Sequence, residues 1–140
     1  MAGKTIHVDI VSAEGEIFAG EAEVVFVPAS EGELGITPRH APLLTLIKAG
    51  EVRVKTAEGE HSVFVGGGAL EVQPTRVTIL ADTAVRAHDI DEAAALAAKQ
   101  RAEEALASKE DKIDQAKALA ELAQAAAQLK LLEKIRKTRG

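Results

Sequence analysis

Apolar and polar residues alternate with a period of two along the first part of the chain, up to about Ala87. Near the start, for example, Ile6, Val8 and Ile10 alternate with polar neighbours. Turn-forming residues interrupt the apolar runs every ~8–12 residues, which is typical of an antiparallel β-sandwich or barrel. No interval between the runs is long enough for a crossover helix, so a parallel sheet is disfavoured.

Further strands are predicted between these turn-forming residues. They are expected around Ile17 and over residues 23–28, 43–48, 51–56, 60–65, 69–72 and 76–80. The separators are Glu14-Gly15, Ala49-Gly50, Glu58-Gly59, residues 66–68 and Gln73-Pro74. We interpret the three glycines at 66–68 as a bulge or a tight strand bend, because no Lys-Ser or Lys-Thr pair of a phosphate-binding loop follows them.

The composition changes to that of helices after the last strand. Asp89 followed three residues later by Glu92 resembles an aspartate version of the capping box, so a helix is expected to begin there. Residues 90–107 are mostly good helix formers, polar residues 108–114 interrupt them, and a second helix is predicted over residues 114–137. The short connection allows the two helices to lie antiparallel as a hairpin.

The packing faces of the two helices are predicted from the spacing of apolar residues along each helix. The second helix carries an apolar stripe, Leu119, Leu122, Ala126, Leu129 and Leu132. Alanines recur in both helices, at 93, 94, 97 and 98 and at 116, 120, 123 and 127. Alanine buries little area, so a hairpin that opens without melting is one interpretation and an inert hairpin is the other. The predicted fold is therefore α+β: an antiparallel β-sandwich over residues 1–87 followed by an antiparallel α-helical hairpin over residues 88–140.

Charge and composition exclude several function classes. The net charge of -5 and the presence of only three aromatic residues argue against nucleic acid as a partner. The sequence has no cysteine, and no apolar stretch approaches the ~20 residues that span a bilayer, so we expect a cytosolic protein without direct membrane insertion. The C-terminal end is basic, with Lys130, Lys134, Arg136, Lys137 and Arg139. These cations either meet an acidic partner or merely complement the helix dipole.

Candidate catalytic chemistry is absent from the pattern. The serines lie in no G-x-S-x-G motif, and the four histidines stand singly without the spacing of zinc ligands. No pair of carboxylates is framed by an apolar pocket pattern that would separate two pKa values. We therefore assign no catalytic residues, no metal site and no cofactor.

The stretch ASEGELGITPRHAPLLTLI, residues 29–47, is the most informative in the chain. Its glycines predict a tight loop that carries Glu31 and Glu33 around an exposed leucine, and two prolines stiffen the segment after it. An acidic, rigid loop suits docking to another protein, and a plain surface turn is the alternative.

That stretch resembles the epsilon subunit of the bacterial F-type ATP synthase, as do residues 7–23, 65–84 and 89–106, in the same order. The resemblance implies a non-catalytic subunit of the rotary central stalk that couples proton-driven rotation to ATP synthesis. It implies that the sandwich binds the gamma subunit and the c-subunit ring, and that the C-terminal helices restrain ATP hydrolysis through the alpha and beta subunits. It also implies a peripheral position on the cytoplasmic face of the bacterial plasma (inner) membrane.

The resemblance also implies residue roles. The expected rotor contacts are Glu31, Gly32, Glu33, Leu34 and His40, and the five C-terminal cations are the expected inhibitory element. Family members whose hairpin binds ATP carry [Ile or Leu]-Asp-x-x-Arg-Ala, whereas this chain has Ala94 in place of the arginine and retains Asp91. Alanine cannot supply forked hydrogen bonds to a nucleotide, so no nucleotide site is expected and Asp91 is interpreted as a first-turn carboxylate.

Two other function classes remain open from the residues alone. One is a freestanding module that binds a small ligand or carbohydrate on the sandwich, and the lack of Trp and Tyr weighs against it. The other is an enzyme with a dispersed active site. Co-purification with alpha, beta and gamma chains would distinguish the resemblance from both.

Overall fold

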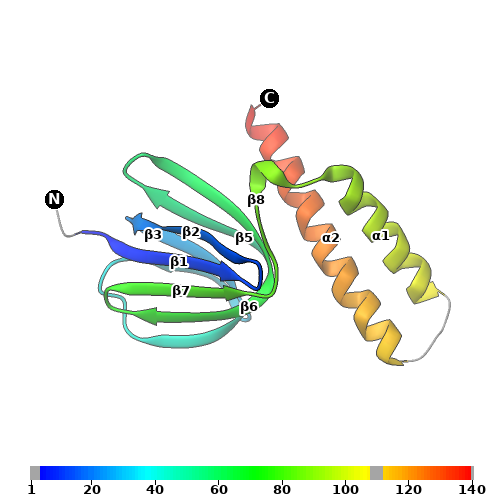
Figure 1. Cartoon of the computed structure of the whole chain (residues 1–140), viewed down its shortest axis with the longest axis horizontal. Helices are drawn as coiled ribbons and strands as arrows, with labels where there is room; N and C mark the ends of the chain where they lie inside the picture. The colour runs from blue at the N-terminus through cyan, green and yellow to red at the C-terminus, as the bar shows by residue number, and fades with distance from the viewer. Residues whose placement is uncertain (1–3, 108–111, 140) are drawn as a thin grey trace. The chain divides into compact units, whose positions relative to one another are not determined.

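The computed structural model describes residues 4–107 and 112–139, and for residues 112–114 and 138–139 it describes the backbone alone. The chain divides into two compact units, Met1–Arg86 and Ala87–Gly140. The first holds β1 (Ile6–Ser12), β2 (Gly15–Ala22), β3 (Val24–Ala29), β4 (Gly32–Ile36), β5 (Leu43–Thr56), β6 (Gly59–Gln73), β7 (Arg76–Ala81) and β8 (Ala84–Arg86). The second holds the 3-10 turn η1 (Ala87–Asp89) and helices α1 (Glu92–Ala107) and α2 (Lys112–Arg139). The predicted class, a β-sandwich followed by a helical hairpin, is confirmed (Figure 1).

The strands follow the order β2-β1-β7-β6-β5-β3-β4, with β8 paired to β6. Six of the seven pairings among the described strands are antiparallel, as predicted. The exception is β1 with β7, which run parallel, with Val8 beside Val77 and Ile10 beside Ile79. No crossover helix is needed, because the intervening chain passes through the other layer of the sandwich before β7 begins.

Ala49-Gly50 and residues 66–68 do not separate strands as predicted, because both segments lie inside long strands. β5 and β6 pair in one continuous register from Leu43 to Thr56, and only the pair of Lys48 with Gly67, near the middle, is missing. On the C-terminal side of Gly67 strand β6 pairs with β7, and on the N-terminal side it pairs with β8. The two long strands therefore bend from one layer into the other. The expected bend at the three glycines is present within β6, where Gly67 and Gly68 have φ values of 100° and 140°.

The sandwich core is built from the apolar positions of the period-two pattern. Along β1 buried and half-buried residues alternate, and Ile6, Val8 and Ile10 are fully buried. The same cluster contains Val25, Val27, Ile36, Val52, Val54, Val63, Val65, Leu70, Val72, Val77 and Ile79. No polar or charged residue is buried in the part of the chain that the structure describes, so the sandwich is held by apolar packing.

The N-terminus of α1 is capped by Asp91 and not by Asp89 as the capping box predicted. The backbone N–H of Ala94 donates to Oδ1 of Asp91 at 3.1 Å, and the N–H of Ala95 donates to the Asp91 carbonyl at 3.0 Å. Asp89 instead ends the 3-10 turn that precedes the helix. Asp91 thus satisfies a backbone donor that would otherwise lack a partner at the helix start.

The buried face of the hairpin agrees only in part with the predicted stripe, because Leu122, Leu129 and Leu132 are half-buried whereas Leu119 and Ala126 are exposed. Buried residues in the helices are Ala95, Ala102, Ala118, Ala125 and Leu131, whereas Leu119 is 56% exposed. The first four are alanines spaced seven apart in each helix, the interval that keeps residues on one side of two packed helices. An alanine seam, more than a leucine stripe, therefore holds the hairpin together.

Candidate functional site

The acidic tip (residues 31–34) forms the end of the β3–β4 hairpin. Gly32 begins β4 with a φ of 132°, a value that side-chain-bearing residues rarely adopt, so glycine is required after Glu31. All four tip residues line an open hollow of about 300 Å³, together with Ala29, Leu43 and Thr45. The structure thus brings together four of the five predicted rotor contacts.

The tip was predicted to be a tight loop, but three of its four residues belong to strand β4. Only residues 30 and 31 separate the strands, because Gly32–Ile36 pairs with β3 along its whole length. Leu34, expected to be exposed, is half-buried and packs against the sandwich core. The strand forms despite two glycines because Leu34 and Ile36 alternate inward from an edge position.

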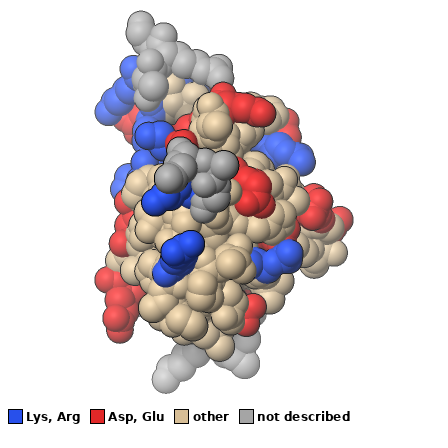
Figure 2. Space-filling view, turned by 90° about the vertical axis from the view of Figure 1, so that its left-hand side faces the viewer, with Lys and Arg blue, Asp and Glu red and all other residues tan. Residues whose placement is uncertain are grey.

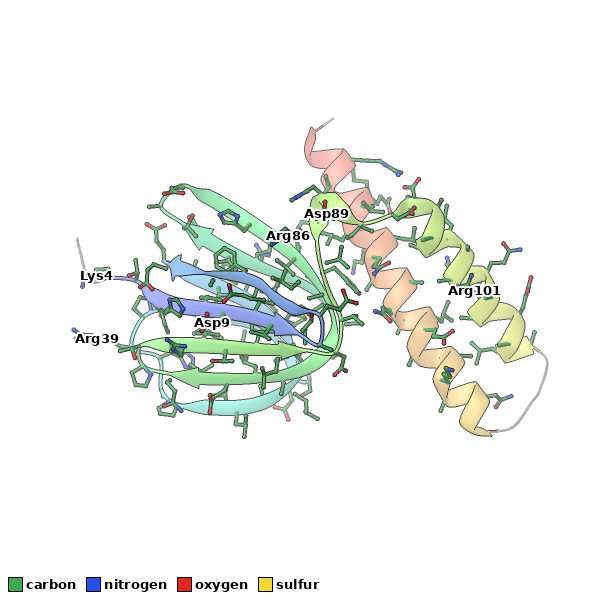
Figure 3. All side chains as sticks on the ribbon, in the orientation of Figure 1. Lys4, Asp9, Arg39, Arg86, Asp89 and Arg101 are labelled. Atoms are coloured by element: carbon green, nitrogen blue, oxygen red, sulfur yellow. The ribbon has the colours of Figure 1, made fainter. Side chains whose placement is uncertain are left out.

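His40, the fifth predicted contact, lies in the loop that leaves the opposite end of β4. Its ring Nδ1 lies 2.8 Å from the carbonyl oxygen of Ala41. The preceding residue, Arg39, has a φ of 65° and donates its N–H to the Pro74 carbonyl at 2.8 Å, which ties the loop to the β6–β7 turn. Figure 3 shows Arg39 at the same end of the sandwich as Lys4. Figure 2 views this end, where acidic and basic side chains are interspersed among uncharged residues.

Glu33 is engaged within the sandwich. Arg53 Nη2 donates to both of its carboxylate oxygens, at 3.1 and 3.3 Å. The Arg53 guanidinium also lies 4.3 Å from the centre of the Phe26 ring and 4.0 Å from Oε1 of Glu51. Arg53 was not predicted as a site residue, because the cross-strand alignment of Phe26 with Arg53 depends on a register that the sequence pattern alone leaves open.

A row of exposed leucines crosses the other layer and was also missed. Leu44, Leu46 and Leu80 are 75%, 67% and 54% exposed, and Ala69 on β6 lies between Leu46 and Leu80 in register. Leu46, Ala69 and Leu80 line an open hollow of about 490 Å³. The sequence could have indicated this exposed row, because these leucines occupy outward positions where a solvated strand would carry polar residues.

A charged cluster on β1, β2 and β7 was likewise not predicted. His7 Nδ1 lies 2.8 Å from Oε2 of Glu21, and its Nε2 lies 3.0 Å from Oδ1 of Asp9, whose other oxygen accepts from Arg76 at 2.8 Å. The hydrogen bond to Glu21, followed by that to Asp9, raises the pKa of His7 above its ordinary value. The same bond lowers the pKa of Glu21. The cluster lies on the sheet surface, with Asp9 marked on β1 in Figure 3.

A hollow of about 460 Å³ lies between α1 and α2. It is lined by Ala94, Ala95, Ala98, Arg101, Glu121, Gln124, Ala125 and Gln128. Ala94, the position of the motif arginine, thus faces this space without a charge. Arg101 is the one cation among the described lining residues, and Asp91 is occupied in capping the helix.

The basic C-terminal end is partly paired within the hairpin. Arg136 forms an ion pair with Glu92 at the start of α1, and Lys137 Nζ lies 3.4 Å from Oε1 of Glu133 one turn earlier. Lys130 and Lys134 are exposed, and the side chain of Arg139 lies outside the described residues. The Arg136–Glu92 pair joins the end of one helix to the start of the other.

The described residues contain no group of three or more histidine, cysteine, aspartate or glutamate side chains placed to hold a metal ion. Neither described helix is both long and apolar enough to cross a bilayer.

Comparisons with known proteins cover both units. Residues 5–87 match the model of the ATP synthase delta/epsilon chain β-sandwich domain, and residues 88–133 match that of its long α-helix domain. The ATP synthase epsilon chain of Nitrosococcus oceani is 64% identical over 137 residues, covering 97% of this chain and 98% of that protein. ATP synthase epsilon chain 1 of Methylococcus capsulatus is 62% identical over 137 residues, covering 96% and 97%.

Solved structures share the fold at low identity. A chain of the Euglena gracilis mitochondrial ATP synthase superposes with a TM-score of 0.70 at 18% identity, covering 98% of this chain and 82% of that one. A chain of the Tetrahymena thermophila enzyme gives 0.61 at 11% identity, covering 91% and 96%. With both family models matched in order and relatives above 60% identity over nearly the full length, the chain belongs to the ATP synthase delta/epsilon family, among its epsilon chains.

Proposed function

We propose that this chain is a non-catalytic central-stalk subunit that couples proton-driven rotation to ATP synthesis and restrains ATP hydrolysis through its C-terminal helices. The observation that carries the proposal is the 64% identity to an ATP synthase epsilon chain over 137 residues, which spans the sandwich and the hairpin together. Identity of this extent makes the whole chain, and not a single borrowed domain, the counterpart of that subunit.

The sandwich, residues 1–87, is proposed to attach to the rotor formed by the gamma subunit and the c-subunit ring. Two surfaces support this role: the acidic tip with its lined hollow, and the row of exposed leucines. Contiguous apolar surface on a soluble domain commonly marks a protein interface. We assign the leucine row to apolar contacts with gamma and keep Glu31, Gly32, Glu33, Leu34 and His40 in or beside the contact with the rotor.

The hairpin, residues 88–140, is proposed to open and reach the alpha and beta subunits. Its alanine seam buries little apolar area, and α1 begins with its own cap at Asp91, so separation of the helices need not melt them. The cations Lys130, Lys134, Arg136, Lys137 and Arg139 supply an attraction to acidic partner surface. We propose no nucleotide regulation, because Ala94 leaves the inter-helix hollow without the motif arginine.

The proposed location follows from these partners. A subunit bound to the c-subunit ring lies peripherally on the cytoplasmic face of the bacterial plasma (inner) membrane, without inserting into the bilayer itself.

Affinity purification of the tagged full chain from bacterial membranes tests the proposal. We expect the alpha, beta and gamma subunits to co-purify with it. The double variant Leu46→Ser/Leu80→Ser should reduce their recovery about tenfold, which corresponds to roughly 1.4 kcal/mol of binding free energy. The control is Leu96→Ser on α1, because Leu96 is also an exposed leucine, with an exposed fraction of 52%. Recovery of the wild-type chain alone would contradict the proposed function.

A further inference from the structure

Arg53 links three strands at one place in the sandwich. In register, Gly35 of β4 lies beside Phe26 of β3, and Phe26 lies beside Arg53 of β5. From β5 the guanidinium reaches across β3 to the carboxylate of Glu33 on β4, where Nη2 donates to both oxygens. We propose that Arg53 is a positioning residue for the acidic tip: it holds Glu33 as an internal strut and leaves Glu31 as the carboxylate offered to the rotor. The inference rests on the proposed function of the tip.

The geometry explains why the tip needs such a link. β4 is the last strand in the sheet order and pairs only with β3 among the described strands. An edge strand of this kind is held by one ladder of backbone hydrogen bonds and by its inward side chains. The Glu33–Arg53 contact adds a connection to β5, an interior strand, on the outward face.

The aromatic ring of Phe26 packs against the guanidinium of Arg53. A Cβ atom on residue 35 would lie 3.2 Å from the Phe26 ring, so the absence of a side chain at Gly35 lets the ring lie close to β4. Arg53 then sits 4.3 Å from the ring centre, within the range of a cation–π contact. The planar guanidinium can stack on the ring and donate at its edge at the same time, which a lysine cannot do.

Pairing with Arg53, and not burial, distinguishes the two tip glutamates, because both are exposed and the Glu33 side chain is 54% exposed. The Arg53 side chain is 24% exposed and faces two carboxylates, Glu33 and Glu51. Ser62 holds Glu51 in turn through a hydrogen bond of 2.5 Å. If Glu33 left to bind a partner, the guanidinium would lose its hydrogen-bonded acceptor while remaining largely covered, which is unfavourable. Glu31 is exposed and pairs with no cation in the part of the chain that the structure describes.

Holding the tip in one conformation lowers the entropy that binding must remove. Loss of Arg53 should therefore weaken rotor binding through mobility of the tip, whereas loss of Glu31 should weaken it through a missing contact. The two effects are separable, because only the first changes the free protein.

The test uses the full chain in two measurements: amide hydrogen exchange of Gly32, Glu33 and Leu34 in the free protein, and affinity for ATP synthase membranes stripped of their epsilon chain. Arg53→Gln should speed exchange at the tip about tenfold and weaken binding about tenfold. Glu33→Gln should do the same, and the double variant should be no worse than either single variant, because the two residues act as one unit. Glu31→Gln should weaken binding and leave exchange unchanged.

The matched control is Lys55→Gln, which removes one positive charge from an exposed position on the same strand. If Arg53→Gln fails to fold, Arg53→Lys replaces it, with the same expected direction and a smaller change. If the wild-type chain binds, but an Arg53 variant has the same exchange rate or the same affinity as Lys55→Gln, this inference is overturned and the proposed function stands. Failure of the wild-type chain to bind would overturn the proposed function, and this inference with it.

Discussion

The imidazole Nδ1 of His7 lies 2.8 Å from Oε2 of Glu21, and this contact joins β1 to β2 at the end of the sheet order. The other ring nitrogen lies 3.0 Å from Oδ1 of Asp9. A neutral imidazole has one N–H and can donate to one of these carboxylates, whereas the imidazolium donates to both. Protonation of His7 therefore strengthens the attachment of the edge strand.

This arrangement predicts a dependence of sandwich stability on pH. The pKa of His7 is raised above 6.5, so its contribution is full below that pH and disappears as the pH rises through the raised folded-state value. The pKa of Glu21 is lowered below 4.5, so its contribution is present above that pH and disappears on acidification. The contact should stabilise most between about pH 4.5 and 6.5, by about 0.2–1 kcal/mol because the groups are exposed.

Urea unfolding of the wild type and His7→Gln at several pH values measures this effect. The difference in free energy of unfolding between the two proteins should shrink from pH 6 to pH 8. His61→Gln, which removes an imidazole that packs against Phe18, is the control for the loss of a histidine ring. A difference that is constant with pH would mean that His7 contributes only packing.

Gly68 should not tolerate a side chain. A Cβ atom there would lie 2.0 Å from the Leu80 carbonyl oxygen, and the φ of 140° is itself unfavourable for other residues. Gly59 has nearly the same φ, 141°, with no atom within 4 Å of a Cβ, so Gly59→Ala carries the backbone strain without the clash. Gly68→Ala should lower the free energy of unfolding by about 1–3 kcal/mol more than Gly59→Ala. Thermal unfolding of both variants measures the difference, and equal losses would show that the strand bend relaxes freely.

The hairpin should not bind ATP at cellular concentrations. Ala94 lines the inter-helix hollow, so an arginine there would place a guanidinium beside it. Titration calorimetry of the wild type should give a dissociation constant weaker than about 1 mM, or about -4 kcal/mol. Ala94→Arg should tighten binding, while Ala97→Arg, on the same helix but not lining the hollow, should not. Micromolar binding by the wild type would require other residues to replace the missing arginine.

The ion pair between Arg136 and Glu92 should act as a latch on the hairpin. Glu92→Gln frees Arg136 and weakens the closed hairpin, so the variant should inhibit ATP hydrolysis more strongly in the assembled enzyme. Arg136→Gln breaks the same pair but also removes a cation from the proposed inhibitory end. An exposed pair contributes about 0.2–1 kcal/mol, so the open population should change by up to about fivefold.

Hydrolysis rates of ATP synthase reconstituted with each variant test this asymmetry. Glu103→Gln, another exposed carboxylate on α1, is the matched control. Equal changes for Glu92→Gln and Arg136→Gln would count against a latch. If neutralising Lys130, Lys134 and Lys137 together also left hydrolysis unchanged, the basic end would have no inhibitory role.

The sequence pattern predicted the elements better than their ends. Strands with one buried face can be recognised from the alternation of apolar and polar residues, as at Ile6, Val8 and Ile10, so most strands of the sandwich could be predicted. Glycines were less informative, because Gly50 and Gly66 permit a bend inside a strand as readily as a turn between two strands. Similarly, Asp89 and Asp91 both suit a helix cap, and only the backbone geometry distinguishes them.

Side-chain partnerships were the least predictable part. The acidic tip could be located from its composition, but the engagement of Glu33 by Arg53 depends on register across three strands. In the hairpin, leucine spacing predicted the packing face only in part, because alanine-rich helices present apolar residues on several sides and burial then depends on close approach of the backbones. Ala118 and Ala125 are buried while Leu119 remains largely exposed.

The parallel pairing of β1 with β7 has a consequence for synthesis on the ribosome. Asp9 and its partner Arg76 are 67 residues apart, so at about 5–20 residues per second β1 waits roughly 3–13 s after its own synthesis before β7 exists. During that interval β1 can pair only with β2, which leaves its other edge open to pairing with other chains. A nascent chain stalled before β7 has left the ribosome should therefore bind chaperones more strongly than one stalled after β7 has left it.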